Sequence, residues 1–424
     1  MRLLYVVHQF FPDCHSGTEQ YCLAIAREAE RRGADVTVLS LDWRHDREKP
    51  PVEVAATSFE GIRVLRLNHW RKLNPNDILR DYQNRHLEGF FQEVMEDLQP
   101  QAVHFFHLRQ IGSNLIHVAN RFGARTVVNL MDFWYLCPRF TLLRSDNTLC
   151  DGPPDGGLGC IACEYPGLEG FEPSPGPAPL SEMQPARLRA LLDRPERQLR
   201  NLKAADTIAA PSRFLAKMFE RNGLPQERMT IVPYGLPSDR ILRRDRKLPN
   251  TPLRISFCGV LSPWKAPRLL VDAVCASTAA FKLTVHGRTD EPMFQSYIDN
   301  MVEAADGNEN IQFPGPYGSE EIGDVFDQTD ILVVPSVWYE NTPFVVLEAF
   351  AAGVPVVASD LGGLSELINE SNGWLFEAGD THALKALLEA LAKDPDQILK
   401  RTPASPPSIA ENYDTFDAMY RQRT

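Results

Sequence analysis

Residues 330–366 constrain the fold most strongly, because they have the pattern of a strand, a helix and a second strand in close succession. Ile331–Val334 is a short apolar, β-branched run, which is typical of a strand buried on both faces of a sheet. Phe344–Ala352 is predicted as a helix that ends at Gly353. Residues 354–358 form the next predicted strand. This segment therefore predicts a parallel sheet covered by helices.

The start of the predicted helix has the features of an anion site. Thr342 is a good N-cap residue, and Pro343 suits the first helical position because no N–H partner is needed there. Helices that follow parallel strands begin at the carboxyl edge of the sheet, where ligands bind. We therefore expect the free backbone N–H groups of residues 344–346 to face a phosphate group.

Two glutamates flank this predicted anion site, Glu340 before the helix and Glu348 within it. A carboxylate beside a phosphate would repel it, so both side chains are expected to hold neutral hydroxyl groups. A diphosphate flanked by hydroxyl groups describes a nucleotide sugar. The alternative is that Glu340 is a solvated loop residue and Glu348 an ordinary surface residue of the helix.

The run from Glu340 to Glu348 resembles the E-x7-E signature of retaining glycosyltransferases of family 4, and Gly353 and the pair Gly362-Gly363 stand at the spacing of that family. The resemblance implies an α/β fold of the GT-B type, with two Rossmann-like, doubly wound domains facing across a cleft. It also implies that the donor contacts the segment between the glutamates, namely Asn341, Thr342, Pro343, Phe344 and Val345.

Length and composition agree with a two-domain globular protein. The chain has 424 residues, 43% of them hydrophobic and 24% charged. Its net charge of −12 argues against broad nucleic-acid binding. No apolar run is long enough to cross a bilayer and a strand follows the first residues directly, so we expect a cytoplasmic protein with reduced thiols. Residues 187–203 are basic and could contact anionic lipid heads or an acidic acceptor, but Pro195 interrupts them and a solvated helix is favoured.

The order of the predicted elements suggests the domain boundaries. The chain opens with a βαβ pattern but lacks the G-x-G-x-x-G fingerprint of dinucleotide binding. We predict an N-terminal, acceptor-side Rossmann-like domain at 1–233, with a cysteine-rich insertion at about 137–185. A hinge at 234–252, a nucleotide-sugar-binding domain at 253–400 and a tail at 401–424 follow. The resemblance implies that the tail crosses back to the N-terminal domain.

Polar residues at predicted strand ends are the site candidates of the N-terminal domain. By resemblance, Gly17 approaches the donor phosphates, although it could simply be a turn residue, and Glu19 could simply be a first-turn acid. Asp132 follows a predicted strand and could orient an acceptor hydroxyl, act as a base, or end the strand through an Asx turn. Met131 stands where a group of family members has histidine. His107 is a further candidate at the end of another strand.

The loop from Gly259 to Lys265 resembles the family loop in which two cations hold the donor diphosphate. Lys265 is retained and is expected to bind phosphate, whereas Val260 occupies the arginine position. Arg268 or Arg288 could supply the missing cation. The resemblance further implies that the nucleotide lies against Gly287 and Arg288, and that the loop containing Tyr317 reaches the base.

Four of the eight cysteines, Cys137, Cys150, Cys160 and Cys163, lie within 27 residues that are rich in Pro and Gly. A C-x-x-C pair with two outlying thiols in a reducing compartment fits a structural tetrahedral zinc site. An iron–sulfur cluster has the same ligands, and unlinked thiols or a regulatory disulfide are the alternatives. A sub-group of family 4 resembles this chain in carrying a cysteine-rich insertion at this place. The remaining four cysteines are expected to be core residues.

Together, these features predict a retaining glycosyltransferase that needs no cofactor for catalysis. The donor would be a UDP- or GDP-sugar, and the acceptor a saccharide, a lipid-linked saccharide or a small molecule, with peripheral contact to the membrane as one option. Glu340 would hold the sugar ring, Glu348 the ribose and Lys265 the leaving diphosphate, while Asp132 would serve the acceptor. The alternatives are a non-catalytic nucleotide-sugar-binding protein and a GT-B epimerase. The oligomeric state does not follow from the sequence.

Overall fold

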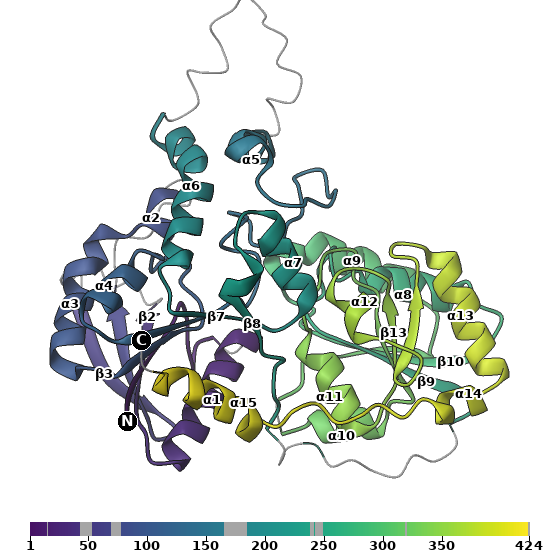
Figure 1. The fold of residues 1–424 in the computed structure, drawn as a ribbon. Helices are drawn as coiled ribbons and strands as arrows, with labels where there is room; N and C mark the ends of the chain where they lie inside the picture. The colour runs from purple at the N-terminus through teal and green to yellow at the C-terminus, as the bar shows by residue number, and fades with distance from the viewer. Residues whose placement is uncertain are drawn as a thin grey trace, which may run out of the picture. The chain divides into compact units, whose positions relative to one another are not determined.

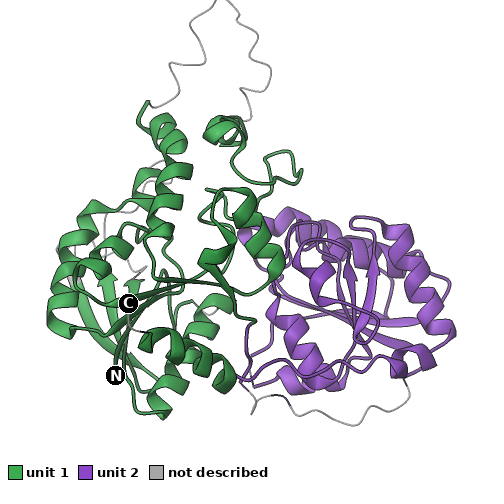
Figure 2. Ribbon diagram, viewed as in Figure 1, with its two compact units in different colours: residues 1–233, 409–424 green, residues 234–408 purple. Residues whose placement is uncertain are grey.

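The protein forms two compact units in a computed structural model that describes residues 1–14, 16–42, 53–68, 78–164, 185–237, 241, 249–318 and 320–422. Unit 1 comprises Met1–Pro233 and Ile409–Thr424, and unit 2 comprises Tyr234–Ser408 (Figure 2). The last helix of the chain thus packs with the N-terminal unit.

The described part of unit 1 is built on an eight-stranded sheet with the order β3-β4-β2-β1-β5-β6-β7-β8. Neighbouring strands are parallel except β3 and β4, which form an antiparallel hairpin. The strands are β1 (Arg2–Val7), β2 (Asp35–Asp42), β3 (Glu53–Phe59), β4 (Ile62–Asn68), β5 (Ala102–Phe105), β6 (Arg125–Asn129), β7 (Thr207–Ala210) and β8 (Met229–Ile231).

Helices flank this sheet (Figure 1). Helix α1 begins after Ser16, whose backbone N–H donates to the Glu19 carboxylate over 2.7 Å, and α15 packs along α1. A buried hydrogen bond from Tyr21 to Asn412 joins these two helices. The helices are α1 (Gly17–Arg31), α2 (Ile78–Tyr82), α3 (Arg85–Leu98), α4 (Leu115–Arg121), α5 (Leu158–Glu164), α6 (Pro185–Lys203), α7 (Arg213–Arg221) and α15 (Ile409–Arg421), with 3-10 turns at Pro154–Gly157 and Gln226–Arg228.

Helix α6 differs from the solvated, interrupted helix that the sequence predicted. It continues through Pro195, and Arg194 is 1% exposed. The Arg194 guanidinium donates to the Trp134 carbonyl, and it lies over the rings of Tyr82 and Trp134 at 5.9 and 5.7 Å. Buried acceptors of this kind cannot be read from a run of basic residues, which otherwise indicates a solvent-facing helix.

The described part of unit 2 contains a six-stranded sheet, all parallel, with the order β11-β10-β9-β12-β13-β14. Along β12 (Ile331–Val334), alternate residues belong to two hydrophobic clusters, so both faces of the strand are buried as predicted. The other strands are β9 (Leu253–Cys258), β10 (Phe281–His286), β11 (Ile311–Gly315), β13 (Val356–Ser359) and β14 (Gly373–Phe376).

Helix α11 has the predicted bounds, Phe344–Ala352, and Gly353 follows it in the left-handed conformation with φ 78°. Its N-cap is Pro343 rather than Thr342, and no side chain caps the helix. The other helices of unit 2 are α8 (Pro267–Cys275), α9 (Gln295–Ala304), α10 (Ile322–Asp327), α12 (Gly363–Leu367), α13 (Thr381–Lys393) and α14 (Asp396–Lys400), with a 3-10 turn at Pro292–Phe294. No helix in the described ranges combines the length and the hydropathy that a membrane span requires.

Each sheet contains one point where the strand order reverses. In unit 1 the reversal lies between β1 and β5, and in unit 2 between β9 and β12. The loops that follow two such strands diverge to opposite faces of the sheet and leave a crevice at its carboxyl edge, where ligands bind in open α/β sheets. The fold therefore directs attention to the residues just after β1, β5, β9 and β12.

Candidate functional site

The crevice of unit 2 is organised around the Glu340 carboxylate, in the loop after β12. Its Oε1 atom accepts hydrogen bonds from Lys265 Nζ at 2.9 Å, Ser336 Oγ at 2.8 Å and Trp338 Nε1 at 2.9 Å. Lys265 arrives from the loop after β9, and the two loops are joined where Val337 N–H donates to the Trp264 carbonyl over 2.8 Å. The predicted glutamate and the predicted lysine, 75 residues apart, therefore meet at the point where the strand order reverses.

Glu340 is 5% exposed, yet it is held in its charged form. Burial alone would raise the pKa of its carboxyl, but the charge of Lys265 and the hydrogen bonds from Trp338, Lys265 and Ser336 outweigh burial and keep that pKa below its ordinary value. The solvated-loop alternative for Glu340 is therefore wrong. All three donors bind Oε1, so the second carboxylate oxygen is the one suited to contact a ligand.

The glycine pair after β13 packs closely against the backbone of the Glu340 loop. Gly363 N–H donates to the Glu340 carbonyl over 2.7 Å. A Cβ atom on Gly363 would come within 1.7 Å of the Asn341 carbonyl oxygen, and one on Gly362 within 2.9 Å of the Glu340 carbonyl oxygen. Only glycines permit this approach, which gives a physical reason for Gly362-Gly363 at this spacing.

Glu348, about one turn into α11, has a different environment. It is half-buried, and burial raises the pKa of its carboxyl to about 7. Its charge acts on the neighbouring groups Cys258 and Tyr317, which come from the ends of β9 and β11. The Tyr317 ring meets His286 edge-on, with the ring centroids 5.3 Å apart. Glu348 and Tyr317 thus share one polar corner of unit 2.

Gly287, after β10, lies where two loops touch. A Cβ atom there would come within 2.3 Å of the Gly259 carbonyl oxygen and within 2.7 Å of the Leu261 side chain. Gly259 itself has φ 153°, in the region that favours glycine. The predicted nucleotide loop is therefore closely packed against the loop that leads to Lys265.

The predicted anion site at the start of α11 needs one correction. The Val346 N–H donates to the Pro343 carbonyl over 3.0 Å, so this amide is already satisfied within the first turn. Within the described residues, the Val345 amide has no hydrogen-bond partner. The Phe344 ring stacks on Tyr234, with centroids 4.9 Å apart. The Val346 amide is therefore not available to a phosphate, because the first turn of the helix is tight, and the sequence pattern alone does not predict this.

Neither arginine that was a candidate for the second phosphate cation is without another partner. Val260, at the arginine position, is 50% exposed. Arg268 is held on α8 by Asp272, at 2.6 Å, and by the Asn300 carbonyl, at 2.6 Å. Arg288 is exposed and pairs with Asp290 at 3.2 Å. Both arginines therefore have other partners, and Lys265 is the cation that stands beside Glu340.

The crevice of unit 1 brings together a histidine and the predicted Asp132. His107 Nδ1 accepts the Arg109 N–H, so its Nε2 carries the proton and donates to Asp132 Oδ2 at 3.1 Å. Asp132 Oδ1 accepts the Trp134 N–H at 2.7 Å, which is the predicted Asx turn. Both interpretations of Asp132 are compatible, because one oxygen shapes the turn while the side chain remains 33% exposed. His107 supplies the imidazole that Met131 cannot.

His8, the first residue after β1, was not singled out in the sequence. Its ring lies 4.3 Å from that of His107. Burial, His107 and Arg109 together hold the pKa of His8 well below its ordinary value, so the ring is neutral. The rule that ligands bind beyond the ends of central strands would have identified this residue.

Glu19 has a structural role in the first turn of α1. Glu19 is fully buried and accepts the Ser16 N–H at 2.7 Å, which is the role of a first-turn acid. Burial raises the pKa of its carboxyl above the ordinary value. Gly17 is the first residue of α1 and is not among the glycines with positive φ. Any special role of Gly17 therefore rests on close approach of a ligand.

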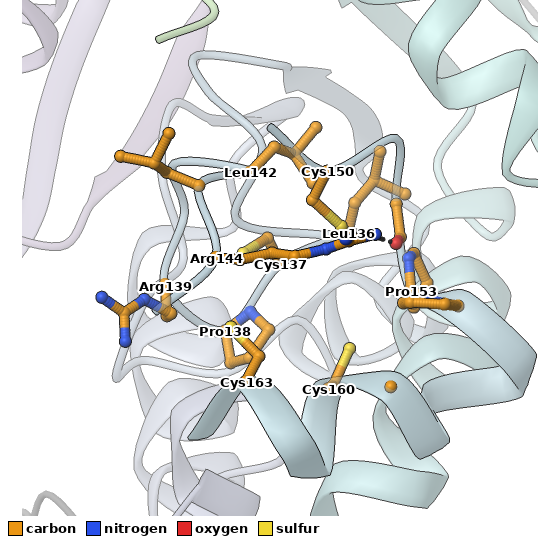
Figure 3. A pocket seen from close by; sticks show the side chains of 14 residues that line it. Leu136, Cys137, Pro138, Arg139, Leu142, Arg144, Cys150, Pro153, Cys160 and Cys163 are labelled. Carbon is orange, nitrogen blue, oxygen red and sulfur yellow. Dashed lines mark hydrogen bonds between the residues drawn. The ribbon is translucent and has the colours of Figure 1, made fainter. Parts of the chain in front are cut away.

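The four clustered cysteines line one cavity of unit 1, which Figure 3 shows from close by. As the side chains stand, no three His, Cys, Asp or Glu residues in the described ranges are arranged to hold a metal ion. All eight cysteines are free. Of the other four, Cys22 and Cys258 are buried as predicted and Cys14 is half-buried, whereas Cys275 is exposed, so the expectation of a core position for Cys275 is wrong.

Two family models together match most of the chain. Residues 16–235 match the model described as glycosyl transferase 4-like domain, and residues 238–404 match the one described as glycosyl transferases group 1. The first match alone covers more than half of the chain.

Known relatives and structures agree with these matches. The amylovoran biosynthesis glycosyltransferase AmsK of Erwinia amylovora is 25% identical over 55% of this chain and 59% of its own length. A D-inositol 3-phosphate glycosyltransferase of Nocardia farcinica is 29% identical over 49% and 50%. The matched part spans about half the length of the curated relatives.

Among solved structures, Anabaena HepE in complex with UDP and glucose superposes with a TM-score of 0.64 at 15% identity, covering 99% of this chain and 98% of that one. At this identity the likeness concerns the fold. With its two parallel-sheet α/β domains, the chain has the GT-B fold.

Proposed function

The chain belongs to the glycosyl transferase 4-like family, and from this premise we propose that it transfers a sugar from a nucleotide-sugar donor to an acceptor hydroxyl, with retention of anomeric configuration, in glycan biosynthesis. We assign donor binding to unit 2 and acceptor binding to unit 1. The observation that carries the proposal is the Glu340 carboxylate, which three donors hold buried and charged at the carboxyl edge of a parallel sheet.

In this proposal the donor diphosphate binds to Lys265 and to the Val345 amide at the start of α11. The ammonium group stabilises the negative charge that grows on the leaving phosphate, and the helix dipole acts in the same direction. Lys265 is shared between Glu340 and the phosphate, because an ammonium group has three donors and Glu340 uses one of them. The free oxygen of Glu340 then accepts from hydroxyl groups of the sugar ring.

Glu348 binds the ribose, and Tyr317 borders the base. A carboxyl with a pKa of about 7 is partly protonated at neutral pH, so it can both accept from and donate to a ribose hydroxyl. By the resemblance, the nucleotide lies against Gly287, whose lack of a side chain also lets its loop pack against the loop that leads to Lys265. By the resemblance, Arg288, Asn341, Thr342, Pro343 and Phe344 complete the donor contacts of unit 2.

On the acceptor side, Asp132 orients the attacking hydroxyl and receives its hydrogen bond. His107 fixes the Asp132 carboxylate from the buried side, and neutral His8 lines the same edge. We propose a front-face route in which the leaving phosphate takes the acceptor proton, because no carboxylate among the described residues is identified as a nucleophile. This route preserves the configuration at the anomeric carbon.

The substrates are proposed by class. A UDP-sugar is the first donor to test, with support from the UDP in the HepE structure, and a GDP-sugar is the second. The acceptor is a saccharide, free or lipid-linked. The reaction would take place in the cytoplasm, at the inner membrane face where the acceptor is lipid-linked. We also place the chain in the sub-group with the cysteine-rich insertion, on its sequence alone.

The test is a donor screen followed by product analysis. UDP- and GDP-sugars are first ranked by the thermal shift they produce, and each binding donor is then incubated with and without candidate acceptors. We expect free nucleoside diphosphate to be released in an acceptor-dependent manner, and NMR coupling constants of the product to show the donor's anomeric configuration. Substitution Glu340→Gln should lower kcat/KM by at least about 100-fold. An inverted product would exclude the front-face route, and donor binding without turnover with any acceptor would support a binding protein.

A further inference from the structure

The cysteine-rich segment between β6 and α6 is the part of unit 1 that the proposed reaction does not explain. Between Asn129 and the start of α6, the described residues contain only the 3-10 turn Pro154–Gly157, the seven-residue helix α5 and an isolated bridge between Leu143 and Leu149. Residues 130–143 bury apolar side chains such as Phe133, Trp134 and Leu142, but of residues 144–164 only Gly152 and Gly157 are buried. Something other than secondary structure must hold its position against α6.

The fold directs the four thiols of this segment toward one space. Cys160 and Cys163 are three residues apart on α5 and therefore share a face of that helix. Cys150 is placed opposite them where its N–H donates to the Leu142 carbonyl over 2.8 Å, and Cys137 enters from the loop after Trp134. In Figure 3 the four side chains surround a common cavity of about 30 Å³. Residues that come from three separate stretches of the segment thus converge on a space of atomic size.

A buried positive charge faces the same cluster. The Arg194 guanidinium is 1% exposed, and the nearest carboxylate oxygen, on Asp81, is 4.0 Å away. Its Nε atom is buried and has no hydrogen-bond partner in the described residues. The cation interacts electrostatically with the sulfur atoms of Cys137 and Cys160. The only described ion pair of this buried cation is at the 4.0 Å limit, so further negative charge beside it would stabilise it.

We propose that Cys137, Cys150, Cys160 and Cys163 bind one Zn²⁺ ion as a structural tetrathiolate site. Each thiol releases its proton to solvent and forms one zinc–sulfur bond, so no oxidant or reductant is required. A zinc ion with four thiolates has a net charge of −2, which Arg194 partly compensates. The side chains turn inward when the ion binds, since in their present positions no three of them are arranged to hold a metal.

Zinc requires less rearrangement of the thiols than an iron–sulfur cluster does. The space between them, about 30 Å³ in their present positions, accommodates a single ion, whereas a cluster places several iron and sulfide atoms between the same thiols. The ion would also fix the segment that follows Asp132 and Trp134, because Cys137 N–H donates to the Phe133 carbonyl over 2.8 Å. The site would in this way stabilise the loop that follows β6 without taking part in the reaction.

The test measures metal on the full-length chain purified under reducing conditions without added chelator. Elemental analysis should give one zinc per chain and less than a tenth of that amount of iron. Substitution Cys160→Ser should remove the zinc, and Cys275→Ser, which alters an exposed cysteine of unit 2, should retain it. If the Cys160→Ser chain does not fold, zinc can instead be removed from the native chain and replaced by Co²⁺. The cobalt protein should then show the intense charge-transfer absorption of four thiolate ligands.

Several results would overturn the proposal. Stoichiometric iron with visible absorption would show a cluster in place of zinc. A mass lower by two hydrogens, with two thiols lost, would show a disulfide. A metal-free chain with eight titratable thiols, whose melting temperature does not change on addition of Zn²⁺, would show unlinked cysteines. None of these outcomes bears on sugar transfer, which the donor screen tests separately.

Discussion

The contact between Lys265 and Glu340 gives the sharpest prediction. We expect Lys265→Met to lower the free energy of unfolding of unit 2 at neutral pH, because it leaves a buried carboxylate with two neutral hydrogen bonds and no counter-charge. At 2.9 Å and an effective dielectric constant of about 20, the attraction is about 6 kcal/mol before the desolvation of both ions offsets much of it. Breaking a fully buried pair costs about 3–5 kcal/mol. The Lys265 side chain is 23% exposed, so water partly replaces it, and we expect about 2–3 kcal/mol.

The loss should depend on pH with a definite sign. In the native chain the pKa of Glu340 lies below its ordinary value, so this carboxylate contributes stability that is present above pH about 4.3 and is lost as the pH falls further. Without Lys265, burial dominates and the pKa rises above the ordinary value. The variant can then protonate Glu340 at pH 5 and avoid the penalty. The difference between variant and native chain should therefore be small at pH 5 and full at pH 7.5.

The assay is urea denaturation at both pH values, followed by a double-mutant cycle. Lys282→Met is the matched control, because Lys282 is exposed on β10 of the same unit, and it should change stability by less than about 0.5 kcal/mol. Adding Glu340→Gln to Lys265→Met should recover part of the lost stability, since the buried charge is then removed. A loss below about 0.5 kcal/mol at pH 7.5, or an equal loss at both pH values, would refute this account of Glu340.

Three further predictions test neighbouring positions. Burial raises the pKa of Glu348 to about 7, so ionisation of this carboxyl opposes folding increasingly as the pH rises above about 4.3. Glu348→Gln should therefore raise the free energy of unfolding by about 1–3 kcal/mol at pH 8 and leave it unchanged at pH 4. The same substitution should raise the KM for the donor about ten-fold. Gly363→Ala should lower the stability of unit 2 in thermal melts and abolish sugar transfer, because its Cβ would lie 1.7 Å from the Asn341 carbonyl oxygen. The control Gly89→Ala places its Cβ in open space, so it should leave stability unchanged or raise it by up to about 1 kcal/mol. His107→Phe should lower kcat at least about ten-fold and change the pH profile of kcat, because the Asp132 carboxylate loses its orienting hydrogen bond. The KM for the donor should change little. An unchanged pH profile would contradict this role of His107.

The amino-acid sequence by itself determined the local elements of both units. Ile331–Val334 forms a strand and Phe344–Ala352 a helix with the predicted bounds, because hydrophobic periodicity and a glycine after the last turn are local signals. The E-x7-E spacing likewise places Glu340 in the loop before this helix and Glu348 within it. Short-range propensities act between residues a few positions apart, and these patterns therefore transfer directly from sequence to structure.

The tertiary structure decided which partners these residues have. Lys265 and Glu340 are 75 positions apart, and only the reversal of strand order between β9 and β12 brings them to 2.9 Å. The same physics places His107 against Asp132 and buries Arg194 in a helix whose composition indicated exposure. Charge pairing and desolvation depend on which surfaces pack together, and packing is a property of the whole sheet rather than of any segment.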